Sequence, residues 1–139
     1  MLYDEDRLAK LSSELNNALN QLVRLESIPE ADFLKDTDKI ASAKYHFLLA
    51  IQSAIDICLH LISMNKLSAP ADYADAFRII GSAANLESDY TTRLENAARF
   101  RNRLVHLYWM VDTVELRRIL SEDLIDLRNF LPRVGKVLD

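Results

Sequence analysis

The sequence predicts an all-α protein, a bundle of about five helices that forms one domain over residues 1–139. The chain holds only two glycines and three prolines, so residues that break helices are rare. Its apolar residues recur at three- and four-residue steps over long stretches, which is the spacing of one face of an α-helix. Half of the residues are apolar and 27% are charged, the ordinary composition of a soluble globular domain.

The first predicted helix runs from about residue 4 to residue 26. Apolar residues on one stripe of this helix predict a face that packs against the core. The stripe consists of Leu8, Leu11, Leu15, Ala18, Leu19, Leu22 and Leu25. The helix is expected to end at Ser27-Ile28-Pro29, because the residue before a proline is pushed out of the helical region.

A second, longer helical stretch runs from about residue 31 to residue 65, with a break near residues 36–38. Beside its broad apolar face lies a polar stripe that consists of Gln52, Asp56, His60 and Ser63. Asp56 and His60 are four residues apart, so they are neighbours on the helix surface. This pair either steadies the helix at its surface or supports a functional stretch farther along the chain.

Two further helices follow a connection that ends at Pro70. A proline suits the first turn of a helix, where no amide hydrogen bond is lost, so Pro70 is expected to begin the third helix. Gly81 is expected to end it, because glycine is favoured just past a helix C-terminus. The fourth helix is predicted to start with Ser88 as its N-cap and to run towards Val105.

The start of the fifth helix has the clearest boundary signal. Asp112 followed by Glu115 has the spacing of a capping box, and apolar residues at helical spacing come after it. The helix then continues until Pro132 bends or ends it. By this count His106 and Tyr108 lie at or just past the end of the fourth helix, where side chains can point into a cleft.

The stretch from Arg101 to Tyr108 gathers side chains that can act on a phosphodiester. Arg101 can hold a phosphate with two parallel donors, and His106 can take or give a proton near neutral pH. The candidate supporting groups, which could orient the imidazole, bind phosphate or stack on a base, are Asn102, Arg103, Arg99 and Tyr108. Arginines and histidines also stabilise helix ends, so helix capping is the alternative.

Arg101 and His106 cannot meet on one uninterrupted helix. Five residues along an α-helix correspond to about 140° of rotation, which puts the two side chains on different faces. Either the helix ends before His106, or a second copy of the chain completes the site across a two-fold axis. Both arrangements can hold together.

The rest of the composition narrows the expected partners. A net charge of −4 does not indicate a nucleic-acid binder, so the basic character must be local if RNA is the substrate.

Cys58, the only cysteine, lies among apolar residues and is expected to be buried and inert. There is no Cys/His cluster with metal-ligand spacing, and we expect neither a metal nor another cofactor. Without a signal-peptide pattern or an apolar run of ~18 residues, we expect a cytoplasmic protein with no membrane partner.

The segment Arg-Asn-Arg-Leu-Val-His-Leu-Tyr, residues 101–108, resembles the signature of HEPN-domain ribonucleases. Its form, Arg-x4-His-x-Tyr, is similar to the HepT branch, the toxin half of HepT/MntA (HEPN/MNT) toxin–antitoxin pairs. Residues 50–62 resemble the long second helix of that family, and residues 73–77 resemble its third. The likeness covers about residues 1–138.

The resemblance implies an HEPN-like antiparallel helical bundle that forms a homodimer, with a site built from Arg101 and His106 of both chains. It implies metal-independent cleavage of cellular RNA, either tRNA or mRNA. It also implies an MntA-like nucleotidyltransferase antitoxin that silences the toxin by transferring AMP from ATP onto Tyr108. The alternative is a non-catalytic helical module that binds a nucleotide or a protein.

Overall fold

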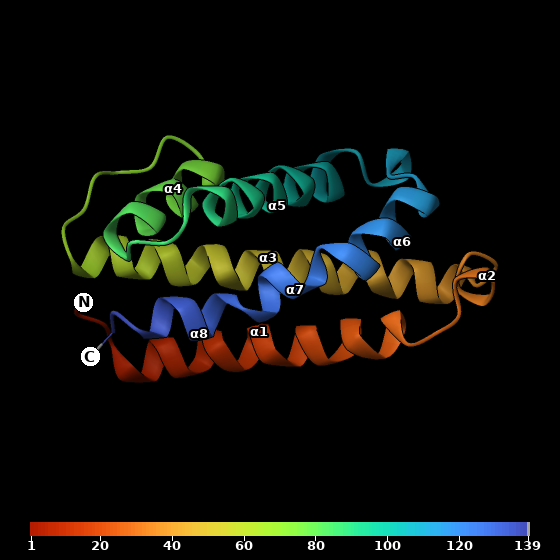
Figure 1. Cartoon of the computed structure of the whole chain (residues 1–139), viewed down its shortest axis with the longest axis horizontal. Helices are drawn as coiled ribbons and strands as arrows, with labels where there is room; N and C mark the ends of the chain where they lie inside the picture. Colours follow the sequence, from red (N-terminus) through yellow and green to blue (C-terminus); the bar gives the residue numbers. More distant parts are fainter. Residues whose placement is uncertain (139) are drawn as a thin grey trace.

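The longest helix, α3 (Thr37–Met64), forms the centre of the bundle in the computed structural model, which describes residues 1–138. Figure 1 shows α1 (Glu5–Glu26) running antiparallel along one side of α3, and α4 with α5 on the other side. A chain of short helices, α6 to α8, returns along the bundle beside α1 and α3. The remaining bounds are α2 Glu30–Phe33, α4 Tyr73–Ala83, α5 Ser88–His106, the 3-10 helix η1 Tyr108–Met110, α6 Thr113–Glu122, α7 Leu124–Arg128 and α8 Phe130–Gly135. The all-α prediction is confirmed.

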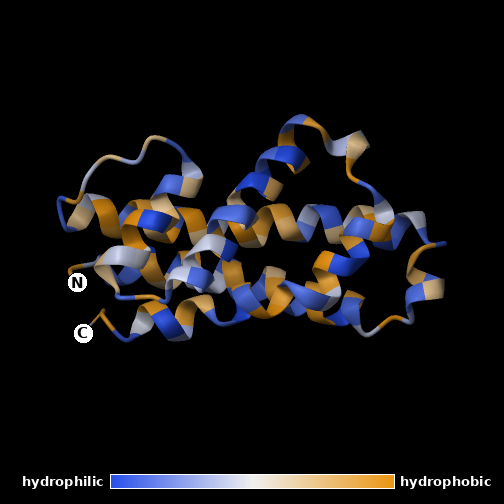
Figure 2. Cartoon of the chain, turned by 45° about the horizontal axis from the view of Figure 1, so that its top comes forward, coloured by the Kyte–Doolittle hydropathy of each residue, from blue (hydrophilic) through white to orange (hydrophobic). Residues whose placement is uncertain are grey.

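The predicted apolar stripe of α1 forms one wall of the core. All of its members except Leu8 are buried, and Leu8 still packs against the core while half-buried. They face α3, whose hydrophobic residues run along most of its length (Figure 2). Leu15 and Leu22 are fully covered, which shows that the three- and four-residue spacing identified the inward face correctly.

The central position of α3 explains its composition. An 18-residue window of this helix has a mean hydropathy of 1.8. By length and composition alone, the helix is therefore long and apolar enough to cross a membrane. The expectation that no such run exists is therefore wrong. More than half of the window, 56%, is buried by α1, α4, α5 and the later helices, as in an ordinary core helix.

Aspartates begin several helices where local spacing predicted a boundary. The side chain of Asp4 accepts a hydrogen bond from the Arg7 amide at 2.9 Å and caps α1. Asp36 caps α3, which confirms the break near residues 36–38. Asp112 accepts from the Glu115 amide at 3.0 Å and caps α6 as predicted.

The predicted roles of the proline and of the serine around the third and fourth helices are wrong. Pro70 lies two residues before Asp72, whose side chain accepts from the Asp75 amide at 2.7 Å and begins α4. Ser88 is the first residue of α5 rather than its N-cap, and Glu87 occupies the cap position without a side-chain hydrogen bond. At α4, Asp72 takes the boundary because its side chain makes the capping hydrogen bond.

The last predicted helix is divided into three. The chain breaks at Asp123 and at Asn129, before the proline that was expected to bend or end the helix. Pro132 instead lies in the first turn of α8, where its missing amide costs no hydrogen bond. This segmentation lets the short helices α6 to α8 change direction as they run beside α1 and α3 (Figure 1).

Gly81 lies inside α4 and does not end it, contrary to the sequence prediction. The end of the helix is marked instead by Asn85, whose φ of 55° is left-handed, and the Leu86 amide donates back to the Gly81 carbonyl at 2.8 Å. A Cβ at position 81 would lie 2.5 Å from Oγ1 and 2.8 Å from Cγ2 of Thr91. Glycine is therefore required here by the close approach of α4 to α5.

Gly81→Ala is expected to lower the free energy of unfolding by about 1–2 kcal/mol, because overpacking outweighs the better helix propensity of alanine. Urea denaturation followed by circular dichroism measures this change. Thr91→Ala introduced into the Gly81→Ala protein deletes the two clashing atoms and is expected to restore most of the loss. A Gly81→Ala protein at least as stable as the wild type would show that Thr91 turns aside without cost.

Cys58 is fully buried on α3, and this burial raises the pKa of its thiol. The expectation of a buried, unreactive cysteine is therefore confirmed.

Candidate active site

The sequence stretch that carries the candidate chemistry lies where α5 ends. His106 is the last residue of α5, Leu107 is its C-cap, and Tyr108 opens η1. His106 and Tyr108 are both exposed, with 42% of Tyr108 accessible. The prediction that these residues lie at or just past the end of the fourth helix is confirmed.

Arg101 is half-buried and held by groups from three helices. Its Nε donates to Oε1 of Gln52 on α3 at 2.8 Å, and one Nη donates to Oδ1 of the neighbouring Asn102 at 3.1 Å. The guanidinium carbon lies 4.9 Å from the centroid of the Tyr73 ring on α4, a cation–π contact. These partners fix the direction of the guanidinium before any ligand arrives.

Asp56 supports this arrangement one step away. Its Oδ1 accepts from Nε2 of Gln52 at 2.9 Å, which fixes the amide so that its oxygen faces Arg101. Gln52 and Tyr73 were not among the predicted site residues. Gln52 belonged to the recognised polar stripe of α3, and that was the only signal in the sequence for its role.

His60 takes part in a different contact. Its Nε2 accepts a hydrogen bond from the Asp4 amide at 3.0 Å, at the start of α1. It lies eight residues along α3 from Gln52, about 12 Å at the rise of an α-helix. The structure therefore brings Asp56, but not His60, into the hydrogen-bond network of Arg101.

Arg101 and His106 are both within the continuous helix α5. The arrangement in which the helix ends before His106 is therefore wrong, and the two side chains leave the helix about 140° apart. Completion of the site by a second copy of the chain stays a prediction.

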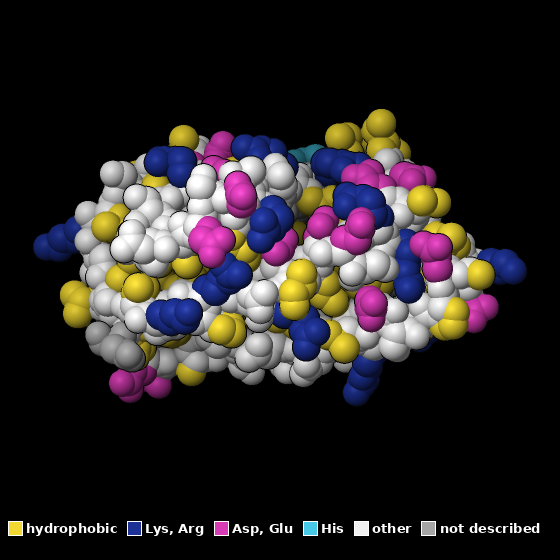
Figure 3. All heavy atoms as spheres, viewed as in Figure 1, with side chains coloured by type: hydrophobic (Ala, Val, Ile, Leu, Met, Phe, Trp, Pro, Cys, Tyr) yellow, Lys and Arg dark blue, Asp and Glu magenta, His cyan; other side chains and the backbone are white. Residues whose placement is uncertain are grey.

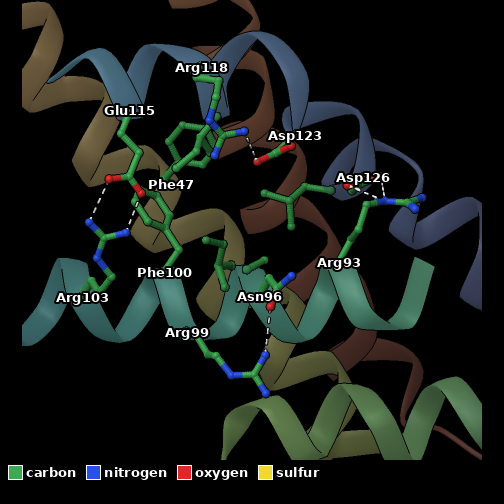
Figure 4. Close-up of a pocket in the computed structure, with 14 residues that line it drawn as sticks. Phe47, Arg93, Asn96, Arg99, Phe100, Arg103, Glu115, Arg118, Asp123 and Asp126 are labelled. Carbon is green, nitrogen blue, oxygen red and sulfur yellow. Dashed lines mark hydrogen bonds and ion pairs between the residues drawn. The ribbon is translucent and has the colours of Figure 1, made fainter. Parts of the chain in front are cut away.

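Arg99 and Arg103 lie on another face of α5, beside a cleft of about 420 Å³ (Figure 4). Arg103 makes a bidentate ion pair with Glu115 of α6, at 2.6 and 3.0 Å, and this contact lowers the pKa of the Glu115 carboxyl. Arg99 donates to Oδ1 of Asn96 at 3.0 Å. The structure thus separates these two arginines from Arg101, with which they were grouped as candidate phosphate ligands.

The charges around this cleft are largely paired among themselves. Arg118 lies 3.5 Å from Asp123, and Arg93 lies 3.1 Å from Asp126, over an apolar floor that includes Phe100 (Figure 4). Burial raises the pKa of Asp123. Neither Arg101 nor His106 lines the cleft, so this hollow is separate from the predicted site.

Lys44 of α3 contacts Tyr108 in two ways. Its Nζ donates to the Tyr108 carbonyl at 3.1 Å and lies 4.4 Å from the centroid of the Tyr108 ring. Only 9% of Lys44 is exposed, so this is a nearly buried cation. Lys44 was not among the predicted site residues, although a lysine next to Ala43, between buried positions of an apolar helix, was a visible signal.

Apolar side chains gather on the surface around η1. Trp109 is 76% exposed and Met110 is 65% exposed, and the protruding hydrophobic group is visible at the edge of the molecule (Figure 3). The other exposed members are Val105, Leu107, Tyr108 and Val114. A concentration of exposed apolar side chains in one region is typical of a surface that contacts a partner.

Among residues 1–138, no group of three or more His, Cys, Asp or Glu side chains is arranged to hold a metal ion.

Comparisons with known proteins identify the family. The model of the HepT-like family, described as ribonuclease HepT-like, matches residues 15–134. A search of curated proteins found no significant match to this chain.

Several solved structures share the fold. A toxin–antitoxin crystal structure with AMP-PNP has 15% sequence identity and a TM-score of 0.85, over 94% of this chain and 98% of that one. A tri-AMPylated Shewanella oneidensis HEPN toxin in complex with MNT antitoxin has 16% identity and a TM-score of 0.85, again over 94% and 98%. The cytosolic protein YutE from Bacillus subtilis, described as of unknown function, has 20% identity and a TM-score of 0.79, over 92% and 87%.

The family model spans most of the chain, and the bundle has the same fold as HEPN toxins in complex with their antitoxins. The chain therefore belongs to the family of HepT-like ribonucleases.

Proposed function

We propose that this protein is the toxin of an HEPN/MNT toxin–antitoxin pair, an endoribonuclease that cleaves cellular RNA, tRNA or mRNA, without a metal ion. Arg101 and His106 are its catalytic residues, and it acts in the cytoplasm, where these RNAs are found. Membership of the HepT-like ribonuclease family supports this activity.

The contacts of the Arg101 side chain are the observation that supports this proposal most directly. Its partners are an amide oxygen of Gln52, an amide oxygen of Asn102 and the Tyr73 ring, all of them neutral. None of the ion pairs among residues 1–138 involves Arg101. A fixed guanidinium whose charge is not cancelled by a carboxylate is suited to stabilise the negative charge of a phosphorane.

The reaction uses the nucleophile that RNA carries. The 2′-oxygen attacks the adjacent phosphorus and loses its proton, while the bond from phosphorus to the 5′-oxygen breaks and that oxygen gains a proton. His106 is exposed at the helix end and can serve as the base or as the acid.

A homodimer completes this site. On one chain Arg101 and His106 leave α5 in different directions, so a phosphate held by Arg101 is reached by the His106 of a two-fold-related copy. The exposed apolar group around η1 lies next to His106 and supports a protein contact at this end of the bundle.

Regulation by an MntA-like nucleotidyltransferase follows from the same region. Solved structures with this fold contain an HEPN toxin with an MNT antitoxin, one of them tri-AMPylated. Tyr108 has the position of an acceptor, because it lies at the helix end two residues from His106 and is 42% exposed. Transfer of AMP from ATP onto its hydroxyl places a bulky anion beside the catalytic histidine and blocks RNA.

RNA cleavage in EDTA tests the activity. The purified protein is expected to degrade tRNA or mRNA in the presence of excess EDTA. Denaturing gel electrophoresis of the RNA measures this cleavage. Arg101→Ala is expected to slow cleavage about 10²–10³-fold, the effect of removing one preorganised charge donor. Arg128→Ala, an exposed arginine of α7 outside the site, is the matched control and is expected to cleave normally.

Cleavage that persists unchanged in Arg101→Ala would point to a contaminant or to another site. Absence of RNA turnover in the wild type, with folding intact, would favour the alternative of a non-catalytic helical module that binds a nucleotide or a protein. Growth arrest on expression, relieved by Arg101→Ala with folding unchanged, would exclude that alternative.

A further inference from the structure

Lys44 is a cation in direct contact with the proposed modification site. It is nearly buried on α3, yet the ion pairs among residues 1–138 are all formed by arginines. Its ammonium instead donates to the Tyr108 carbonyl and lies over the Tyr108 ring. A buried cation is costly to keep unless it is well compensated, so a position with two neutral partners calls for a reason beyond packing.

We propose that Lys44 is a positioning residue for the modification of Tyr108, with two effects. It holds the phenol in place for attack on ATP, and its charge stabilises the phosphate that arrives on the phenolic oxygen. This inference rests on the proposed AMPylation of Tyr108 by a nucleotidyltransferase.

The first effect comes from the hydrogen bond to the backbone. The Tyr108 carbonyl lies at the start of η1, and its contact with Lys44 at 3.1 Å joins this short segment to the central helix, 64 residues away in the sequence. The Tyr108 ring face is turned to Nζ at 4.4 Å, so the ring is held at its face while the residue remains 42% exposed. A preoriented acceptor loses less entropy in reaching the attack geometry.

The second effect comes from charge. In the transfer, the Tyr108 oxygen forms a bond to the α-phosphorus of ATP, the bond to the bridging oxygen of pyrophosphate breaks, and the phenolic proton is lost to a base. The product carries a phosphodiester with one negative charge where the phenol had none. Lys44, whose flexible stem places its ammonium over the ring, is the cation that can turn to this anion without leaving α3.

Three substitutions separate the charge from the hydrogen bond. Lys44→Gln keeps a donor for the Tyr108 carbonyl and loses the charge, Lys44→Met loses both, and Lys44→Arg keeps both. The full-length proteins are incubated with ATP, Mg²⁺ and the MntA-like nucleotidyltransferase proposed as the antitoxin, and AMP addition is followed by intact-mass spectrometry. Lys39→Met, which changes an exposed lysine of the same helix, is the control for loss of one charge.

We expect Lys44→Gln to slow AMP addition about tenfold in kcat, the effect of losing one charge-assisted interaction, and Lys44→Met to slow it further, because methionine also loses the hydrogen bond to the Tyr108 carbonyl. Lys44→Arg and Lys39→Met are expected to stay within about twofold of the wild type. A structural role alone would be rescued by glutamine, so slowing in the glutamine protein identifies the effect of the charge, and the further slowing in the methionine protein identifies the effect of the hydrogen bond. Circular dichroism establishes that each variant is folded.

Wild-type rates in a folded Lys44→Gln protein would overturn this inference and leave the proposed function intact. If Lys44→Met fails to fold, the glutamine and arginine proteins alone decide between the two outcomes. Absence of AMP addition to the wild-type protein would overturn both the tyrosine modification and the role of Lys44.

Discussion

A mixture of Arg101→Ala and His106→Ala proteins is expected to cleave RNA, although each variant alone is nearly inactive. Loss of the histidine removes general acid–base catalysis, which contributes about 10²–10⁴-fold. Because the two side chains lie about 140° apart on α5, an intact site pairs Arg101 of one chain with His106 of another. A mixed dimer contains one such intact pair.

The size of the recovery is set by how the chains associate. With random pairing, about half of the dimers are mixed and each has one of its two sites intact, so activity returns to about a quarter of the wild-type value. The two variants are unfolded and refolded together so that their subunits exchange, and cleavage of tRNA in EDTA is measured. A gel-filtration profile of each preparation establishes the oligomeric state.

The control replaces one partner by the double variant Arg101→Ala/His106→Ala, whose mixture with either single variant has no intact pair in any arrangement. A site shared between chains would be contradicted if the mixture of the two single variants were no more active than the control mixtures. That outcome would require Arg101 and His106 of one chain to reach the same phosphate, against the geometry of α5.

Tyr108→Phe is expected to abolish the gain in mass that the wild-type protein shows with ATP, Mg²⁺ and its nucleotidyltransferase. Phenylalanine keeps the ring and its contact with Lys44, at 4.4 Å in the wild type, but has no oxygen to attack the α-phosphorus. The expected effect is complete, because only the nucleophilic atom is removed. The same variant is expected to keep cleaving RNA after this incubation, whereas the modified wild type stops.

Tyr45 offers the matched comparison. It is 55% exposed on α3, more accessible than Tyr108, and Tyr45→Phe is expected to gain the same mass as the wild type. Selectivity for Tyr108 therefore depends on its place at the helix end rather than on exposure. If Tyr108→Phe gains the same mass as the wild type, the acceptor is another residue.

Features that depend on neighbouring residues could be read from the sequence. The aspartate caps at Asp4, Asp36 and Asp112 make hydrogen bonds to amides two or three residues away, so their effect does not depend on the rest of the fold. The leucine spacing of α1 gave its buried face, and the signal at Asp112 placed the end of α5 near His106.

Two of the failures involve contacts between helices. Gly81 was expected at a helix end, but its function is to let Thr91 of α5 approach, which no local pattern reveals. Pro132 was expected to bend or end a helix that had already broken at Asn129, because the segment from α6 to α8 packs along other helices.

The sequence by itself determined the helical class, the main helix boundaries and the presence of an arginine, a histidine and a tyrosine at the end of one helix. These follow from spacing, caps and residue chemistry, which act over a few residues. Only the tertiary structure decided that Gln52 and Asp56 hold Arg101, that Glu115 engages Arg103 and that Lys44 holds Tyr108. The physical reason is distance along the chain: Gln52 lies 49 residues from Arg101 and Lys44 lies 64 residues from Tyr108, so each pair meets only after α3 packs against the later helices.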